Sequence, residues 1–262
     1  MKNVILFSDL DRTIIHSSKF LKESINPEIV EFNKDKKPIS YMEKEALLLL
    51  NELSNNLLFI PVTTRSLEQY KRIDLKITPL YSITSNGGII LKNNKRLKSW
   101  DDFIKNNISN KNYMEIQDKL KLINKYLTRE LTLIDNVFFF SKINDNNLFE
   151  LNYELDNILK YYDWTYTIQG NKIYIMPKFI SKENAINYLL QNELSKDNFI
   201  ITAGDGKLDY NFVFLPDSNL SIVPLNSELY NLIEDKDFKF NSFKYNTCGT
   251  LDMLKYIKQE IK

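Results

Sequence analysis

The segment that most constrains the fold runs from Val4 to Thr13 and reads VILFSDLDRT. Its four leading apolar residues predict a short buried strand. Asp9 and Asp11 follow the strand at alternate positions, so an extended chain would point both to the same side. In open α/β sheets, the carboxyl ends of the strands form the edge where ligands bind. Two carboxylates this close repel each other unless a cation or a shared proton lies between them. The segment therefore predicts a reactive site at a sheet edge.

A simpler interpretation of the same segment is a solvated turn, in which Asp and Thr cap a helix near Ile14. The composition does not decide between a reactive site and a solvated turn, but it excludes several classes of catalytic site. His16 is the only histidine and Cys248 is the only cysteine. These counts exclude an internal disulfide, a Ser-His-Asp or Cys-His site and a multi-histidine zinc site. Carboxylates, lysine, threonine and serine remain as the reactive groups.

Charge and hydropathy indicate the class of partner. The formal net charge is +1, which gives no electrostatic reason to expect nucleic acid or an anionic membrane as a partner. We find no signal peptide, and the longest apolar run, Ala46 to Leu50, is far shorter than a membrane span. We therefore expect a cytoplasmic protein.

Alternating strand and helix patterns occupy both ends of the chain. In the first part we expect strands at 4–8, 57–62, 80–84 and 89–91, helices at 42–53 and 67–73, and a polar loop at 23–38. In the last part we expect a helix at 182–192, strands at 199–202, 220–223 and 238–240, and a final helix that begins at residue 249 or 250. This alternation is typical of one doubly wound domain.

The middle of the chain has a different pattern. It predicts helices at 113–127 and 148–162, strands near 130–134 and at 137–143, and a hairpin of 164–169 with 172–176 across Gly170 and Asn171. Such a pattern suits an α+β module with an antiparallel sheet. We therefore expect an α/β fold: a doubly wound, Rossmann-like parallel sheet core made of 1–92 and 179–262, with an inserted α+β cap domain at 93–178.

Further polar residues follow the other strands. Thr63 and Arg65 come after the second strand, Lys182 begins a helix, and Asp205 and Asp209 lie in the segment GDGKLD. Because the carboxyl ends of parallel strands meet at one edge, we expect these groups to gather there. Oxygen ligands suit Mg²⁺, and a lysine with a threonine suits a phosphoryl group. One aspartate can then attack phosphorus, and a second can act as acid and then as base.

With these motifs the chain resembles the haloacid-dehalogenase-like phosphatase superfamily. The matching segments are FSDLDRT, VTTRS, SKENA and AGDGKLD, in the order and spacing of that superfamily. The segment TSNGG is similar to the one that precedes the large cap in the subgroup of sucrose-phosphate and mannosyl-3-phosphoglycerate phosphatases. More distantly, SYMEKEA and PVTTRSLEQYKRI are similar to a bacterial branch encoded near tellurium-stress genes. Two departures are Thr64, where the superfamily usually has glycine, and Leu208, where it often has asparagine.

The resemblance implies a role for each matching carboxylate. Asp9 is implied as the nucleophile and a Mg²⁺ ligand, and Asp11 as the general acid and base with its main-chain carbonyl on the metal. Asp205 is implied as a direct metal ligand, and Asp209 as a ligand that binds directly or through water.

The resemblance also implies two phosphate-binding residues, and the sequence itself suggests two more. Thr63 and Lys182 are expected to hold the substrate phosphate. Arg65 is expected to reach it too, with a salt bridge to a nearby acid as the alternative. Asn86 is expected either to bond the substrate or to cap its own loop.

These expectations describe a Mg²⁺-dependent hydrolase of a phosphomonoester, which acts through an aspartyl-phosphate on a small phosphorylated metabolite such as a sugar phosphate. Two alternatives stay open: a phosphotransferase or phosphomutase that uses the same aspartate, and a catalytically quiet module that binds a phosphorylated ligand. We expect a monomer or weak homodimer with neither nucleic acid nor membrane as partner.

Overall fold

The structure, a computed structural model, describes residues 3–108 and 110–261. The chain forms two compact units. The first combines Met1–Arg96 with Lys182–Lys262, and the second is Leu97–Ser181. The second unit is therefore inserted in the sequence of the first. Among the described residues, no helix has the length and apolarity needed to cross a lipid bilayer.

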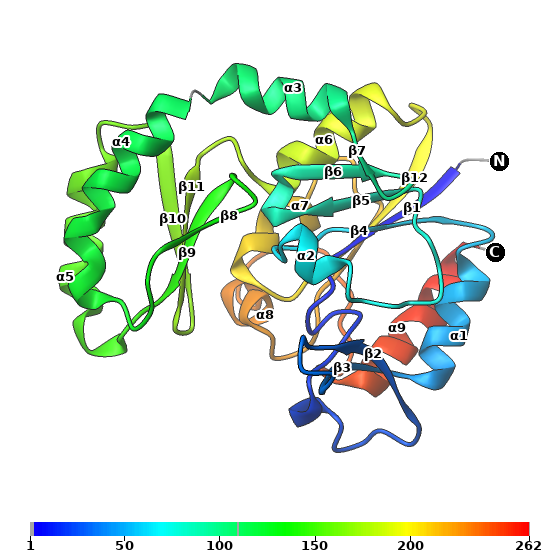
Figure 1. The fold of residues 1–262 in the computed structure, drawn as a ribbon. Helices are drawn as coiled ribbons and strands as arrows, with labels where there is room; N and C mark the ends of the chain where they lie inside the picture. The colour runs from blue at the N-terminus through cyan, green and yellow to red at the C-terminus, as the bar shows by residue number, and fades with distance from the viewer. Residues whose placement is uncertain (1–2, 109, 262) are drawn as a thin grey trace. The chain divides into compact units, whose positions relative to one another are not determined.

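A parallel four-stranded sheet forms the centre of the first unit (Figure 1). Its strands are β1 (Asn3–Ser8), β4 (Leu58–Pro61), β12 (Asn198–Ala203) and β13 (Leu220–Ile222), in the order β13-β12-β1-β4. From β1 the chain passes to β4 at one edge of the sheet, and from β12 it passes to β13 at the other edge. The reversal falls between β1 and β12, where ligands bind in sheets of this kind. The predicted parallel sheet is confirmed.

Helices cover both faces of this sheet. On one face, α1 (Lys44–Leu53) contacts α9 (Thr247–Glu260). On the other face, α6 (Lys182–Asn192) contacts α7 (Tyr210–Val213), as Figure 1 shows. Burial on both faces explains why β1 and β12 are apolar along most of their length.

Shorter elements extend the sheet edge. The strands β5 (Tyr81–Thr84), β6 (Ile89–Lys92) and β7 (Lys95–Arg96) form an antiparallel sheet, which a backbone hydrogen bond from Thr63 to Ile83 (2.9 Å) joins to the end of β4. This unit also contains short helices: α2 (Leu67–Tyr70), α8 (Glu228–Ile233), and the 3-10 turns η1 (Ser18–Phe20), η2 (Ser85–Gly87) and η5 (Lys207–Asp209).

Two sequence predictions for this unit are wrong. The expected loop at 23–38 contains β2 (Pro27–Phe32), which pairs with β3 (Pro38–Glu43) in an antiparallel hairpin. The expected strand at 238–240 is absent from the described residues there. Its apolar side chains are used for ring packing instead, since Phe238 lies 4.4 Å from Phe214 between ring centroids. High strand propensity was the misleading signal.

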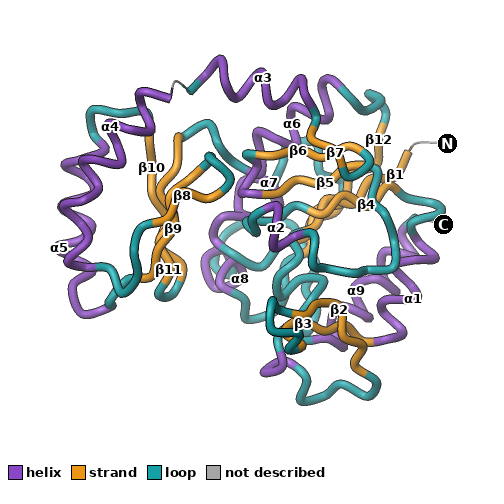
Figure 2. Tube along the Cα trace, viewed as in Figure 1, coloured by secondary structure: helices purple, strands orange, loops and turns teal. Residues whose placement is uncertain are grey.

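The second unit is an α+β module (Figure 2). Its antiparallel sheet has the order β10-β11-β9-β8, from Trp164–Gln169, Lys172–Pro177, Phe138–Lys142 and Thr132–Ile134. Its helices are α3 (Lys98–Asn107), α4 (Asn110–Leu120), α5 (Leu148–Leu159), and the 3-10 turns η3 (Lys121–Tyr126) and η4 (Asp145–Asn147). Side chains from the sheet, α4, η3 and α5 share one apolar core. The helix α3 was not predicted.

Candidate active site

Three buried carboxylates meet at the carboxyl edge of the parallel sheet. Asp9 directly follows β1, and its backbone N–H donates to Ala203 at the end of β12 (2.8 Å). Asp205 follows β12, and Asp209 lies in the turn η5. One carboxylate oxygen from each lies within 4.8 Å of the others, and the three residues are 5%, 6% and 2% exposed. The expected gathering of these acids is therefore present in the structure.

The loop after β12 holds Asp209 in place. The Asp209 Oδ2 atom accepts hydrogen bonds from the backbone N–H groups of Asp205 (3.1 Å) and Gly206 (2.8 Å). This fold of the loop needs a glycine, because a Cβ atom at Gly204 would lie 2.6 Å from the Asp209 Cβ. The glycine after β12 thus lets two carboxylates turn toward the same point.

Lys182 joins two of these acids. It is the first residue of α6 and is 2% exposed. Its Nζ atom donates to Asp9 Oδ1 and Asp209 Oδ1, at 2.6 Å each. Burial opposes the charge on the ammonium, but Asp209 and Asp9 outweigh it and raise the Lys182 pKa above its ordinary value. The side chain is therefore a fixed positive charge inside the site.

One lysine does not balance three buried acids. Burial raises the pKa of Asp9 well above its ordinary value against the pull of Lys182, and Asp209 and Asp205 raise it further. Burial and the neighbouring Asp209 raise the pKa of Asp205 to about 7. Convergent oxygen donors with excess negative charge suit a hard divalent cation such as Mg²⁺. The donor set of Asp9, Asp205 and Asp209 therefore fits the metal that the sequence implied.

The side chain of Asp11 turns to Arg65 and lies outside this three-residue cluster. Arg65 forms a bidentate ion pair with Asp11, in which Nε lies 2.7 Å from Oδ2 and Nη2 lies 2.7 Å from Oδ1. The third nitrogen, Nη1, lies 2.7 Å from the buried carboxylate of Glu31. Burial opposes the charge of Arg65, but Asp11 and Glu31 raise its pKa. The structure thus places Arg65 in the salt bridge that the sequence left as the alternative to phosphate binding.

Thr63 and Asn86 lie together at the end of β4. Thr63 is fully buried, its hydroxyl accepts from the Arg65 backbone N–H (3.2 Å), and its carbonyl accepts from the Asn86 backbone N–H (3.1 Å). Ser85, Asn86 and Gly87 have consecutive positive φ values of 53°, 56° and 96°. Such conformations are costly for side chains other than glycine and concentrate at functional sites. The turn η2 also contacts α6, the helix that begins with Lys182.

Two residues at the site escaped the sequence analysis. One is Glu31, behind Arg65. The other is Tyr245, whose hydroxyl donates to Asp205 Oδ2 (2.5 Å) while Arg12 Nη1 lies 3.9 Å from the same oxygen. The ring of Tyr245 packs edge-on against Phe20, with 5.2 Å between centroids. Both missed residues reach the site through tertiary contacts, and neither belongs to a local motif.

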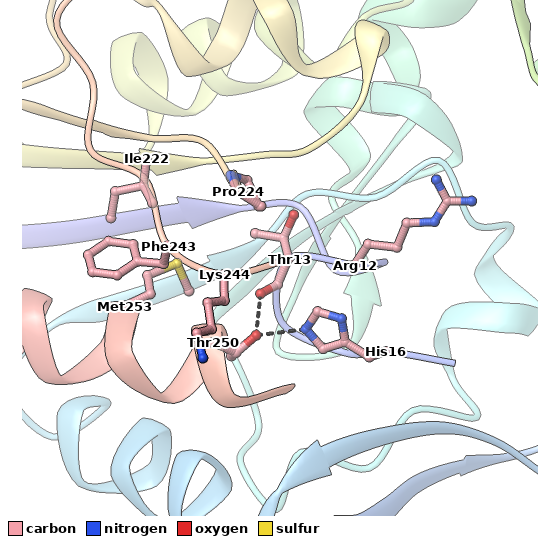
Figure 3. A pocket seen from close by; sticks show the side chains of 10 residues that line it. Arg12, Thr13, His16, Ile222, Pro224, Phe243, Lys244, Thr250 and Met253 are labelled. Atoms are coloured by element: carbon pink, nitrogen blue, oxygen red, sulfur yellow. Dashed lines mark hydrogen bonds between the residues drawn. The ribbon is translucent and has the colours of Figure 1, made fainter. Parts of the chain in front are cut away.

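The single histidine is buried and hydrogen-bonded within the protein interior. His16 is 2% exposed, and its Nε2 atom lies 2.7 Å from Thr250 Oγ1 in α9 (Figure 3). The Thr250 hydroxyl donates its proton to the Thr13 carbonyl (2.8 Å), so His16 Nε2 must carry the proton of their shared bond. This chain of bonds ties the loop after β1 to α9. These bonds explain why His16 is packed in the interior.

A doubly wound sheet with an inserted α+β module, and with buried aspartates and a lysine at the switch point, defines a phosphatase of the haloacid-dehalogenase-like class. Residues 2–237 match the family model described as sucrose-6F-phosphate phosphohydrolase. The chain belongs to this family and is a phosphoric monoester hydrolase. The expected superfamily, fold class and enzyme class are confirmed.

Solved structures show the same fold. The sucrose-phosphatase of Synechocystis sp. PCC6803, determined with sucrose and phosphate, is 14% identical, with a TM-score of 0.70 over 98% of this chain and 99% of that one. A haloacid dehalogenase-like hydrolase protein of Bacillus subtilis is 16% identical, with a TM-score of 0.57 over 98% and 93%. The Aspergillus fumigatus trehalose-6-phosphate phosphatase is 12% identical, with a TM-score of 0.54 over 97% and 93%. No curated protein matches the chain significantly.

Proposed function

We propose that the chain hydrolyses a sugar phosphate with Mg²⁺ and a phosphorylated Asp9 as intermediate. The observation that carries this proposal is the burial of three aspartates around Lys182 at the switch point of the parallel sheet. The substrate class is supported by the family description and by relatives named for sucrose phosphate and trehalose 6-phosphate.

We assign the metal ligands to Asp9, Asp205 and Asp209, together with the main-chain carbonyl of Asp11. When bound, Mg²⁺ offsets the negative charge of the transferring phosphoryl group. Lys182 adds a fixed positive charge at the same point, because its ammonium contacts Asp9 directly. We assign Thr63 and Asn86, at the end of β4, to the oxygens of the substrate phosphate.

The reaction then has two steps. In the first, a carboxylate oxygen of Asp9 attacks phosphorus, the bond to the leaving oxygen breaks, and Asp11 gives that oxygen a proton. In the second, Asp11 takes a proton from water, the water oxygen attacks phosphorus, and the bond to Asp9 breaks. Inorganic phosphate leaves, and both aspartates return to their starting state.

The second step distinguishes hydrolysis from transfer to another hydroxyl group. Arg65 donates two hydrogen bonds to Asp11, the group that takes the proton in this step, whether from water or from another hydroxyl group. We favour hydrolysis over a phosphotransferase or phosphomutase reaction because the family model that matches the chain describes a phosphohydrolase. We also propose a cytoplasmic monomer or weak homodimer that acts on small molecules.

The first experiment is release of inorganic phosphate from an aryl phosphate, sucrose 6F-phosphate and trehalose 6-phosphate. Wild type with Mg²⁺, wild type with EDTA, and Asp9→Asn are compared. We expect release that requires Mg²⁺, disappears in Asp9→Asn, and equals the substrate consumed. Phosphorylated products in place of phosphate would indicate transfer. Absence of turnover in folded, Mg²⁺-replete wild type, on these and a wider panel of sugar phosphates, would contradict the proposal.

A further inference from the structure

Glu31 is a buried charge on the hairpin strand β2, outside the aspartate cluster. Its side chain has no exposed surface. Its carboxylate accepts from Arg65 Nη1 (2.7 Å), from Ser40 Oγ (2.6 Å) and from Arg72 Nε (3.3 Å). A buried carboxylate is tolerated only with partners of this kind. Glu31 therefore sits between two arginines, one of which holds Asp11.

The backbone turns Glu31 inward. The register of β2 against β3 shifts on both sides of this residue, between Ile29 and Glu31 and again between Glu31 and Phe32. As a result Val30 and Glu31 are both buried, although neighbours in a regular strand face opposite sides. β-bulges beside active sites commonly redirect a side chain in this way. The irregularity of β2 thus has a local effect, which is to aim a carboxylate at Arg65.

The geometry of the guanidinium links Glu31 to Asp11. Its three nitrogens lie in one plane, so a partner fixed on Nη1 restricts the directions of Nε and Nη2. Glu31 holds Nη1 from the buried side, while Nε and Nη2 point to Asp11, whose side chain is 48% exposed. Arg65 itself is only 13% exposed. Buried Glu31 therefore fixes the guanidinium of Arg65, and the guanidinium in turn orients the exposed carboxylate of Asp11.

We propose that Glu31 is a positioning residue that acts through Arg65 to fix the orientation of Asp11 for proton transfer. The inference rests on the proposed function, because the role of Asp11 as acid and base belongs to that function. Proton transfer requires the acid to lie within hydrogen-bond reach of the reacting oxygen. A small misplacement of Asp11 therefore lowers kcat, whereas ground-state binding of the substrate changes little.

The variants Glu31→Gln and Glu31→Ala test this, with Glu43→Gln as the matched control. Glu43 is also buried, on β3 of the same hairpin, and its carboxylate accepts from the backbone N–H groups of Ile25 (3.1 Å) and Asn26 (2.6 Å). We expect kcat to fall about tenfold in Glu31→Ala, with KM within about twofold. The fall should be smaller in Glu31→Gln, because the amide oxygen still accepts from Arg65. Glu43→Gln should lower Tm and leave kcat unchanged.

A double-mutant cycle with Arg65→Met separates positioning from general loss of stability. If Glu31 acts through Arg65, then Glu31→Ala has no further effect on kcat once Arg65 is methionine. An equal fall in kcat in both backgrounds would overturn the inference. A fall in kcat in Glu43→Gln as large as that in Glu31→Ala would also overturn it, since both would then reflect damage to the hairpin.

A measurement without turnover keeps this inference distinct from the proposed function. The Nε–H signal of Arg65 in a nitrogen-15 NMR spectrum, assigned with Arg65→Lys, reports the ion pair with Asp11 directly. We expect a protected signal in wild type and in Glu43→Gln, and a shifted or exchanging one in Glu31→Ala. An unchanged signal in Glu31→Ala overturns the positioning role alone, whereas an inactive wild type contradicts the proposed function alone.

Discussion

The ammonium of Lys182 lies 2.6 Å from a carboxylate oxygen of Asp9, and both side chains are almost completely buried. The two residues are far apart in sequence and meet because β1 ends where α6 begins. The lysine also contacts Asp209. Its raised pKa keeps it charged across the physiological range, so it offsets the repulsion among the acids.

Replacing Lys182 with methionine should therefore damage both turnover and stability. We expect kcat to fall about 100- to 1,000-fold, because a preorganised charge at the phosphoryl group is lost. The free energy of unfolding should fall by about 3 kcal/mol, since a buried ion pair loses one partner. Lys178→Met is the control, because Lys178 is exposed on the other unit. Phosphate release and urea unfolding measure both effects, and equal kcat values in the two variants would refute the role of Lys182.

Tyr245 should tune the affinity for Mg²⁺. Its hydroxyl holds Oδ2 of Asp205, and it lies beyond the residues 2–237 that match the family model. Partners that orient a metal ligand typically change affinity 10- to 100-fold when removed. We expect Tyr245→Phe to weaken Mg²⁺ binding about tenfold by isothermal titration calorimetry. Tyr161→Phe, at an exposed ring of the second unit, should bind as wild type. Identical affinities in both variants would show that Asp205 needs no such support.

The elements predicted best from the sequence are those that a short, continuous run of residues defines. The strand β1 is a run of apolar residues buried on both faces, and Asp9 follows it directly, so pattern and position coincide. The same holds for β12 and the acids of the GDGKLD segment. Glycine at 204, which allows the close approach of Asp209, belongs to that local pattern as well.

Features set by tertiary contacts could not be predicted in this way. Glu31 lies in a polar stretch that suggested a loop, and only the bulge in β2 and the two arginines explain its burial. Tyr245 reaches Asp205 from a segment 40 residues further along the chain. The sequence also could not tell whether Arg65 binds the substrate phosphate or a neighbouring carboxylate, because its partner Glu31 is brought to it by the packing of the β2–β3 hairpin.

The substitution Gly204→Ala should act on the site through sterics. A Cβ atom there would lie 2.6 Å from the Asp209 Cβ, so Asp209 must move away from Asp205. We expect weaker Mg²⁺ binding and a fall in kcat of at least about tenfold. Gly170→Ala is the matched control. Its added Cβ meets nothing within 4 Å, and the side chain at a positive φ of 52° costs about 1 kcal/mol. Calorimetry and phosphate release compare the two, and a Gly204→Ala variant with wild-type metal affinity would contradict the expected clash.

His16 should make stability depend on pH. Burial is the main cause that lowers its pKa to about 4; Asp11 opposes the shift, and Arg12 adds to it. Between that value and the ordinary 6.5, the unfolded chain binds a proton that the folded chain does not, so stability falls as the pH falls through this window. From pH 6.5 to pH 5 the loss should be about 1.6 kcal/mol. The variant His16→Gln keeps a donor toward Thr250 and removes the titration. Urea unfolding of both proteins from pH 7 to pH 4.5 isolates the effect of His16, because the carboxylates titrate in both. Over this range the wild type should lose about 2.4 kcal/mol more than His16→Gln. Parallel curves would show that the imidazole is not held neutral by burial.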